Sequence, residues 1–266
     1  MQDHLLNLPG IRWWRKRRFD AAFAEGWAGS HRGIFETFDQ ARQSAPPTKP
    51  VGFDNAGPAA MYQEWHSRTR PSDYPVLFWL AEWLRAGARR VFDLGGHVGI
   101  SYYAFGPYLR FDPGLRWTVL EVEATRRAGA ALALERGVDA QLSFVSELSA
   151  ASGADILLAA GSLQFIDGPG LGTSLRSLKD RPRWVLINKT PLTPGKTFVT
   201  LQNASTAFVP CRITNADEFI ADLTGAGYRL VDRWENADMG CLLPMEPERS
   251  VRCHSGLAFE RTDPGP

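Results

Sequence analysis

The segment Val91–Ser101, with the sequence VFDLGGHVGIS, constrains the fold of this chain more than any other. It joins a short apolar run to a glycine turn and then to a helix predicted over residues 100–109. Gly95 and Gly96 allow the backbone to turn sharply and to approach a ligand, and Gly99 allows the helix to pack closely on the strand. Units of this kind hold NAD, FAD, nucleotide sugars or S-adenosylmethionine, so the glycine loop alone leaves the ligand class open.

Strands and helices alternate from residue 71 onward. Strands are predicted at residues 89–94, 116–122, 142–145, 155–160 and 183–188, and helices at residues 76–86, 100–109, 124–136 and about 170–178. Each strand is a nearly continuous apolar run, which favours a parallel sheet covered by helices on both faces.

The last part of the chain has a different pattern. A short strand pair is predicted at residues 198–201 and 209–213, followed by a helix over residues 214–223. Two late strands, at residues 228–234 and 256–260, have no convincing helix between them, which predicts an antiparallel addition at the sheet edge. Five parallel strands and a late antiparallel hairpin predict an α/β protein with the Rossmann-like sheet of class I methyltransferases, although a fold alone does not establish a function.

Residues 1–70 do not alternate strand and helix. We predict that they form an N-terminal helical cap, and that residues 71–266 form the main ligand-binding domain. The cap is rich in aromatic residues, among them Tyr62 and Trp65, which are candidates for stacking on a sugar or another ring of an acceptor.

Composition excludes several classes of function. Lys and Arg total 30 and Asp and Glu total 29, which gives a formal net charge of +1. A nucleic-acid-binding chain normally has a large basic excess, so we expect no nucleic-acid partner. The three cysteines form no C-x-x-C pair, and we therefore expect no metal site. There is no signal-peptide pattern and no apolar run long enough to cross a bilayer, so we expect a cytoplasmic protein.

One short basic and aromatic cluster, Trp13–Phe19 (WWRKRRF), allows two interpretations. Aromatic residues beside basic ones can make weak peripheral contact with an anionic membrane surface. Alternatively, the cluster lies on a solvated helix whose tryptophans pack on the domain. We favour the second interpretation, because a single short cluster binds a membrane only weakly.

Two acidic residues narrow the choice of ligand. Asp93 ends the first strand, two residues before Gly95, and would repel a pyrophosphate placed at the following helix N-terminus. S-adenosylmethionine has no phosphate and carries an ammonium and a sulfonium, so an acid is compatible with it. Glu121 ends the second strand, where an acid accepts hydrogen bonds from ribose hydroxyls, and Glu123 is the alternative if that strand continues. The alternatives are structural roles without a ligand: Asp93 caps the next helix, and Glu121 is a solvated residue at the end of a strand.

Several segments together resemble a small bacterial family of S-adenosylmethionine-dependent methyltransferases that is often associated with surface-polysaccharide genes. The matching segments are Asp93–Tyr103 (DLGGHVGISYY), Asp155–Ile166 (DILLAAGSLQFI), Ile187–Pro191 (INKTP), Phe198–Asn203 (FVTLQN) and Cys211–Ile213. The resemblance covers most of the chain and implies a class I methyltransferase fold with S-adenosylmethionine as cofactor. It leaves the acceptor open, and His97 departs from the smaller residue common at its loop position.

The expected cofactor contacts lie at the carboxyl ends of the strands, where ligands bind in open parallel sheets. They are Asp93, Gly95, Gly96, His97, Gly99, Glu121, Ser146, Gly161, Ser162 and Gln164.

Two residues are candidates for the methyl-transfer step itself. The imidazole of His97 can serve as a general base near neutral pH, and Lys189, which follows the fifth strand, can bind an anionic acceptor. A packing role for His97 and a surface position for Lys189 are the alternatives. The leading hypothesis is an O-methyltransferase acting on a glycan or small molecule. A binding protein without turnover and a nicotinamide-dependent sugar enzyme are the competing hypotheses, and the oligomeric state is left open.

Overall fold

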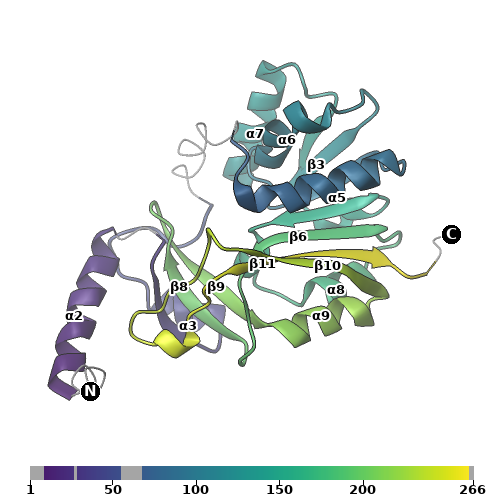
Figure 1. Cartoon of the computed structure of the whole chain (residues 1–266). Helices are drawn as coiled ribbons and strands as arrows, with labels where there is room; N and C mark the ends of the chain where they lie inside the picture. The colour runs from purple at the N-terminus through teal and green to yellow at the C-terminus, as the bar shows by residue number, and fades with distance from the viewer. Residues whose placement is uncertain (1–8, 27–28, 55–67, 264–266) are drawn as a thin grey trace.

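The computed structural model describes residues 9–26, 29–54 and 68–263. Seven strands form the central sheet: β2 (Arg90–Leu94), β3 (Arg116–Leu120), β4 (Leu142–Val145), β5 (Ile156–Ala160), β6 (Trp184–Thr190), β10 (Tyr228–Asn236) and β11 (His254–Arg261). Their order across the sheet is β10-β11-β6-β5-β2-β3-β4 (Figure 1). The pairs among β2 to β6 are parallel, whereas β11 runs antiparallel to both β6 and β10. The predicted parallel sheet and late hairpin are therefore confirmed.

Helices cover both faces of this sheet. On one face lie α5 (Tyr74–Arg85), α6 (Ile100–Leu109) and α7 (Glu123–Glu135), and on the other lie α8 (Leu171–Arg176) and α9 (Ala216–Gly225). Alternate residues of β5 point to opposite faces, so Ile156 belongs to the core under α5 whereas Leu157 belongs to the core under α9. Burial on both faces explains why the parallel strands are continuous apolar runs.

Within the described ranges, four short 3₁₀ turns complete the connections. They are η1 (Pro71–Asp73), η2 (Leu148–Ala151), η3 (Leu163–Phe165) and η4 (Pro247–Arg249). The first of them leads directly into α5, and the third follows the carboxyl end of β5, so both lie where ligands bind in sheets of this type.

A second, smaller sheet lies beside the main one. It contains β1 (His31–Phe35), β7 (Leu192–Thr193), β8 (Phe198–Asn203) and β9 (Phe208–Asn215), in the order β1-β8-β9-β7. The predicted strand pair at residues 198–201 and 209–213 is confirmed as β8 and β9, which are antiparallel. β1 pairs with the outer edge of β8, and this pairing joins the N-terminal region to a segment that follows the parallel strands in sequence (Figure 1).

The N-terminal region differs from the helical cap predicted for residues 1–70. It is helical at α2 (Pro9–Glu25) and α3 (Phe38–Gln43), but β1 lies between them. A strand forms there because the edge of β8 offers unpaired backbone groups, and such an edge favours pairing with another strand. The small sheet therefore contains strands from both sides of residue 70, where the sequence predicts the domain boundary.

The prediction that both tryptophans of the basic cluster pack on the domain is wrong. Trp13 and Trp14 are 59% and 53% exposed, and it is Phe19 and Phe23 that are buried, against Phe208 of β9. Among the described residues, no helix combines the length and the apolar character that are needed to cross a bilayer.

Candidate ligand-binding site

The order of the strands reverses between β2 and β5. From β2 the chain continues outward to β3 and β4, then crosses back to β5 and β6 on the other side. The carboxyl ends of two such neighbours diverge into a crevice, which is where ligands bind in open α/β sheets. A cavity of about 930 Å³ lies at this point and contacts Asp93 and Gly95 at the end of β2 and Ala160 and Gly161 at the end of β5.

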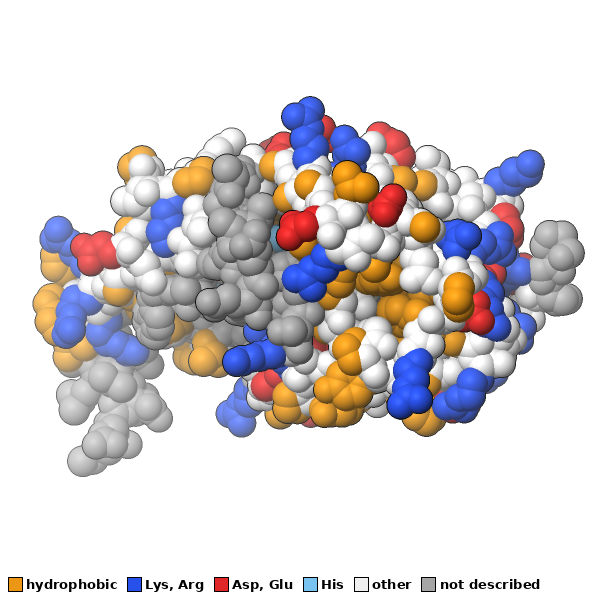
Figure 2. All heavy atoms as spheres, turned by 90° about the horizontal axis from the view of Figure 1, so that it is seen from above, with side chains coloured by type: hydrophobic (Ala, Val, Ile, Leu, Met, Phe, Trp, Pro, Cys, Tyr) orange, Lys and Arg blue, Asp and Glu red, His pale blue; other side chains and the backbone are white. Residues whose placement is uncertain are grey.

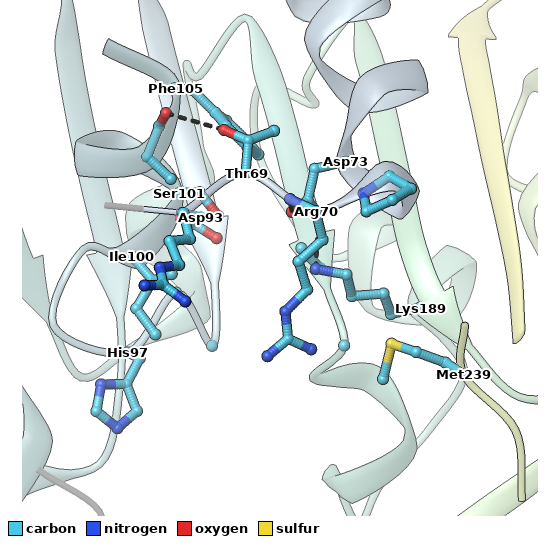
Figure 3. A pocket seen from close by; sticks show the side chains of 17 residues that line it. Thr69, Arg70, Asp73, Asp93, His97, Ile100, Ser101, Phe105, Lys189 and Met239 are labelled. Carbon is cyan, nitrogen blue, oxygen red and sulfur yellow. Dashed lines mark hydrogen bonds and ion pairs between the residues drawn. The ribbon is translucent and has the colours of Figure 1, made fainter. Parts of the chain in front are cut away.

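This cavity, the larger of two at the strand ends, brings together six of the site residues predicted from the sequence. These are Asp93, Gly95, Gly96, His97, Gly161 and Lys189. The segment before η1 contributes Thr69 and Arg70 from the opposite side, and Figure 3 shows the guanidinium of Arg70 directed into the cavity between His97 and Lys189. The cavity is thus lined by acidic and basic groups together.

Asp93 has an unsatisfied carboxylate oxygen. Its side chain is fully buried, and its Oδ2 accepts a hydrogen bond from the indole N–H of Trp117 at 3.1 Å. Among the described residues no donor reaches Oδ1. The pKa of Asp93 is raised to about 7: burial raises it most, the hydrogen bond from Trp117 lowers it, and the charge of the nearby Glu121 raises it by a smaller amount. A buried oxygen without a partner is costly, so a donor or cation from a ligand in the cavity would stabilise it.

The glycines of the loop are required by close contacts. Gly95 has φ +72°, and a Cβ there would lie 2.3 Å from the Cβ of Ser162. A Cβ on Gly96 would lie 2.4 Å from the Cγ of Asp93. Gly99 instead faces Leu142 of β4, where a Cβ would lie 2.8 Å from a methyl carbon, so this glycine allows close helix packing and does not line the cavity.

Two non-glycine residues at the cavity hold left-handed backbone conformations. His97 has φ +57° and Lys189 has φ +55°. This conformation costs a non-glycine residue roughly 1–2 kcal/mol, and such strain gathers at ligand-binding sites. The two residues lie on opposite sides of the cavity (Figure 3).

Glu121 fixes the backbone of the glycine loop by hydrogen bonding. Its Oε1 accepts the backbone N–H of His97 at 3.0 Å, and its Oε2 accepts that of Val122 at 3.0 Å. Burial raises the pKa of Glu121, while these two hydrogen bonds lower it. Glu121 lines neither this cavity nor a second one on the α9 side of the strand ends, but a carboxylate has lone pairs to accept further bonds.

Two predicted residues line a second cavity of about 640 Å³ on the α9 side of the strand ends. Ser146 and Gln164 contact it, together with Leu94. The hydroxyl of Ser162 donates to the carbonyl of Leu94, and Ser162 also packs on Gly95, which lines the larger cavity. Ser162 therefore lies where the two cavities approach each other, and a ligand long enough to reach both would pass beside it.

Lys189 is ion-paired, contrary to the alternative that it is a surface lysine. Its Nζ lies 2.6 Å from Oδ1 of Asp73, and the two side chains are 17% and 8% exposed. The other carboxylate oxygen of Asp73 accepts the backbone N–H of Arg70 at 3.0 Å. The Asp73 pairing and the cavity position of Arg70 were missed, because neither residue belongs to a recognisable motif.

Asn188, which precedes Lys189, joins three elements. Its amide donates to the carbonyl of Ser72 at 2.9 Å, and its carbonyl accepts from Trp234 at 3.1 Å and from Asn236 at 2.9 Å. It is completely buried and fixes η1 and β10 against the end of β6. Tyr62 and Trp65, predicted to stack on an acceptor, lie outside the described residues.

The sheet order defines the class of fold. One antiparallel strand, β11, inserted between β6 and β10 at the edge of an otherwise parallel seven-stranded sheet is the arrangement of the class I methyltransferase fold. This agrees with the fold predicted from the sequence.

Comparison with known proteins gives likeness to solved structures only. No protein-family model and no curated protein matches the chain. The 1,6-didemethyltoxoflavin-N1-methyltransferase of Burkholderia thailandensis, solved with 1,6-didemethyltoxoflavin and S-adenosylhomocysteine, is 20% identical over 77% of this chain and 83% of that chain, with a TM-score of 0.49. The methyltransferase CcbJ of Streptomyces caelestis is 16% identical over 77% of this chain and 96% of that chain, with a TM-score of 0.48. At such identities a likeness does not identify an acceptor.

Proposed function

We propose that this protein is an S-adenosylmethionine-dependent methyltransferase. The observation that carries the proposal is the buried carboxylate of Asp93, which has an oxygen without a protein donor and lines the cavity at the strand reversal. A ligand with a positively charged donor satisfies this oxygen, and S-adenosylmethionine carries an ammonium group and a sulfonium but no phosphate.

The chain has residues suited to each part of this cofactor. Asp93 would hold the ammonium, and the guanidinium of Arg70 would hold the carboxylate of the same methionine group. Ser146 and Gln164, which line the second cavity, would contact the adenosine end. Glu121 holds the backbone of the glycine loop at His97, and its remaining lone pairs would accept from the ribose. The bound cofactor supplies an electrophilic methyl group.

The same geometry disfavours a dinucleotide. The carboxylate of Asp93 packs directly against Gly96, so a diphosphate at this turn would lie beside a buried acid. Like charges in a poorly solvated site repel each other strongly. A nicotinamide-dependent sugar enzyme is therefore the weaker hypothesis.

The acceptor that we propose is a hydroxyl group of a small molecule or glycan, with surface-polysaccharide synthesis in the cytoplasm as the setting. His97 lines the cavity, and an imidazole titrates close to neutral pH, so we assign it the removal of the hydroxyl proton. Lys189 already neutralises Asp73, so its role is to hold the cavity wall instead of binding an anionic acceptor.

Two measurements test these proposals separately. Calorimetric titration with S-adenosylmethionine, S-adenosylhomocysteine and NAD tests the cofactor: binding of the first two without NAD is the expected result, and binding of NAD alone would contradict the proposal. Methyl transfer to a panel of sugars, nucleotide sugars and small phenols then tests turnover. Tight binding of the cofactor with no transfer to any member of a broad panel would favour a binding protein without turnover.

A further inference from the structure

Helix α2 presents an apolar and basic surface that no part of the described chain covers. Trp13 and Trp14 are 59% and 53% exposed, and Ile11 is 39% exposed. The opposite side of the helix buries Phe19 and Phe23 against the small sheet. The helix is therefore anchored by one side and leaves two large aromatic side chains in solvent on the other.

Two basic residues of α2, Arg17 and Arg18, lie on the same outward side as the tryptophans. The guanidinium of Arg17 lies 4.9 Å from the ring centre of Trp13, and that of Arg18 lies 4.7 Å from the ring centre of Trp14. Each pair is separated by four positions, one helical turn, so ring and charge point in the same direction. Figure 2 shows hydrophobic and basic side chains together at the end of the molecule where α2 lies.

This positive charge is not neutralised within the described chain. Lys16 pairs with Asp20 at 2.6 Å, but no described carboxylate lies within ion-pair distance of Arg17 or Arg18. The chain as a whole has a formal net charge of only +1, so attraction to a charged partner has to come from local clusters such as this one. A concentration of charge on one exposed helix indicates a negatively charged partner.

We propose that α2 docks on an anionic lipid bilayer. Tryptophan favours the level of the lipid headgroups, where its ring is partly buried and its N–H stays hydrated. Arg17 and Arg18 would contact lipid phosphates around it. A bilayer fits better than a protein groove, because the two indoles lie on a convex helix surface with cations beside them. One short helix gives weak, reversible binding that does not depend on the proposed enzymatic function.

The test is sedimentation of the full chain with vesicles of phosphatidylcholine alone and of phosphatidylcholine with an equal part of phosphatidylglycerol. We expect binding to the mixed vesicles at low salt, loss of binding at high salt, and little binding to phosphatidylcholine. The double variant Arg17→Gln/Arg18→Gln should lower the partition coefficient about thirtyfold, since each basic residue contributes to binding near an anionic surface. Trp13→Ala/Trp14→Ala should also lower it at least about tenfold.

A matched control is Phe78→Ala/Tyr108→Ala, which removes two aromatic side chains that are 55% and 57% exposed elsewhere on the molecule. These substitutions should leave vesicle binding unchanged. Thermal melting of each variant checks that α2 and the small sheet remain folded. Absence of binding to mixed vesicles, or equal loss in the control, would overturn the proposal. So would sedimentation velocity without lipid showing that α2 holds a dimer together.

Discussion

Lys189 and Asp73 form an ion pair between a partly buried lysine and a buried carboxylate, with 2.6 Å between Nζ and Oδ1. The pair joins the end of β6 to the 3₁₀ turn before α5, across the wall of the larger cavity. The pair forms part of the cavity wall on the side opposite the glycine loop. The charge of Lys189 is therefore already paired within the protein.

Breaking this pair on one side should be strongly destabilising. Lys189→Met leaves the Asp73 carboxylate buried without a counterion, which should lower the free energy of unfolding by about 3–5 kcal/mol. The double variant Asp73→Asn/Lys189→Met removes both charges and should recover much of that loss. Urea denaturation measures both values. If Lys189→Met unfolds at the same urea concentration as the unsubstituted protein, the buried pair does not support the fold.

Replacing Asp93 should stabilise the ligand-free protein at alkaline pH. Burial raises the pKa of Asp93 to about 7, well above its value in the unfolded chain. Between these two pKa values the folded state holds a proton that the unfolded state has lost, so its contribution to stability falls as the pH rises through 7.

Asp93→Asn removes this titration, and the variant should melt at a higher temperature than the unsubstituted protein at pH 8, with a smaller difference at pH 5. Scanning calorimetry at both pH values measures it. A variant that is less stable at pH 8 would mean that the ionised carboxylate supports the empty fold.

Acid should destabilise the protein through His31 of β1. Burial, and secondly the charge of His254, lower the pKa of His31 to about 4. As the pH falls from 6.5 towards 4, the unfolded chain takes up a proton that the folded chain does not, and stability is lost by up to about 3 kcal/mol. His31→Gln should show a flatter decline in unfolding free energy over this range. An identical decline in both proteins would assign the acid sensitivity to other groups.

His97→Gly separates the fold of the loop from proton removal. Glycine readily adopts the left-handed conformation that His97 holds at φ +57°, so the variant should keep its melting temperature within a few degrees. Affinity for S-adenosylhomocysteine should change little, because the backbone N–H to Glu121 is retained. Methyl transfer to a hydroxyl acceptor should fall by about 10²–10⁴-fold if His97 is the base. Transfer at the original rate would assign proton removal elsewhere.

The part of the site that follows local rules was predictable. Asp93 and the glycines belong to one strand, turn and helix, and their spacing predicts where that unit binds a ligand. The pairing of Asp73 with Lys189 was not predictable, because it joins distant segments that only tertiary packing brings together. β1 was missed for a similar reason: five residues have weak strand character alone, and the edge of β8 decides their conformation.

The most direct test of the central claim is the pH dependence of S-adenosylhomocysteine affinity, since this product carries the same ammonium group as the cofactor. Between pH 6 and 7.5 the Asp93 carboxyl loses its proton, so the Kd should fall as the pH rises. Asp93→Asn should bind more weakly, by roughly 1–3 kcal/mol at pH 7.5, with little pH dependence left. The same affinity and pH profile in both proteins would contradict the claim that Asp93 holds the ligand's cation.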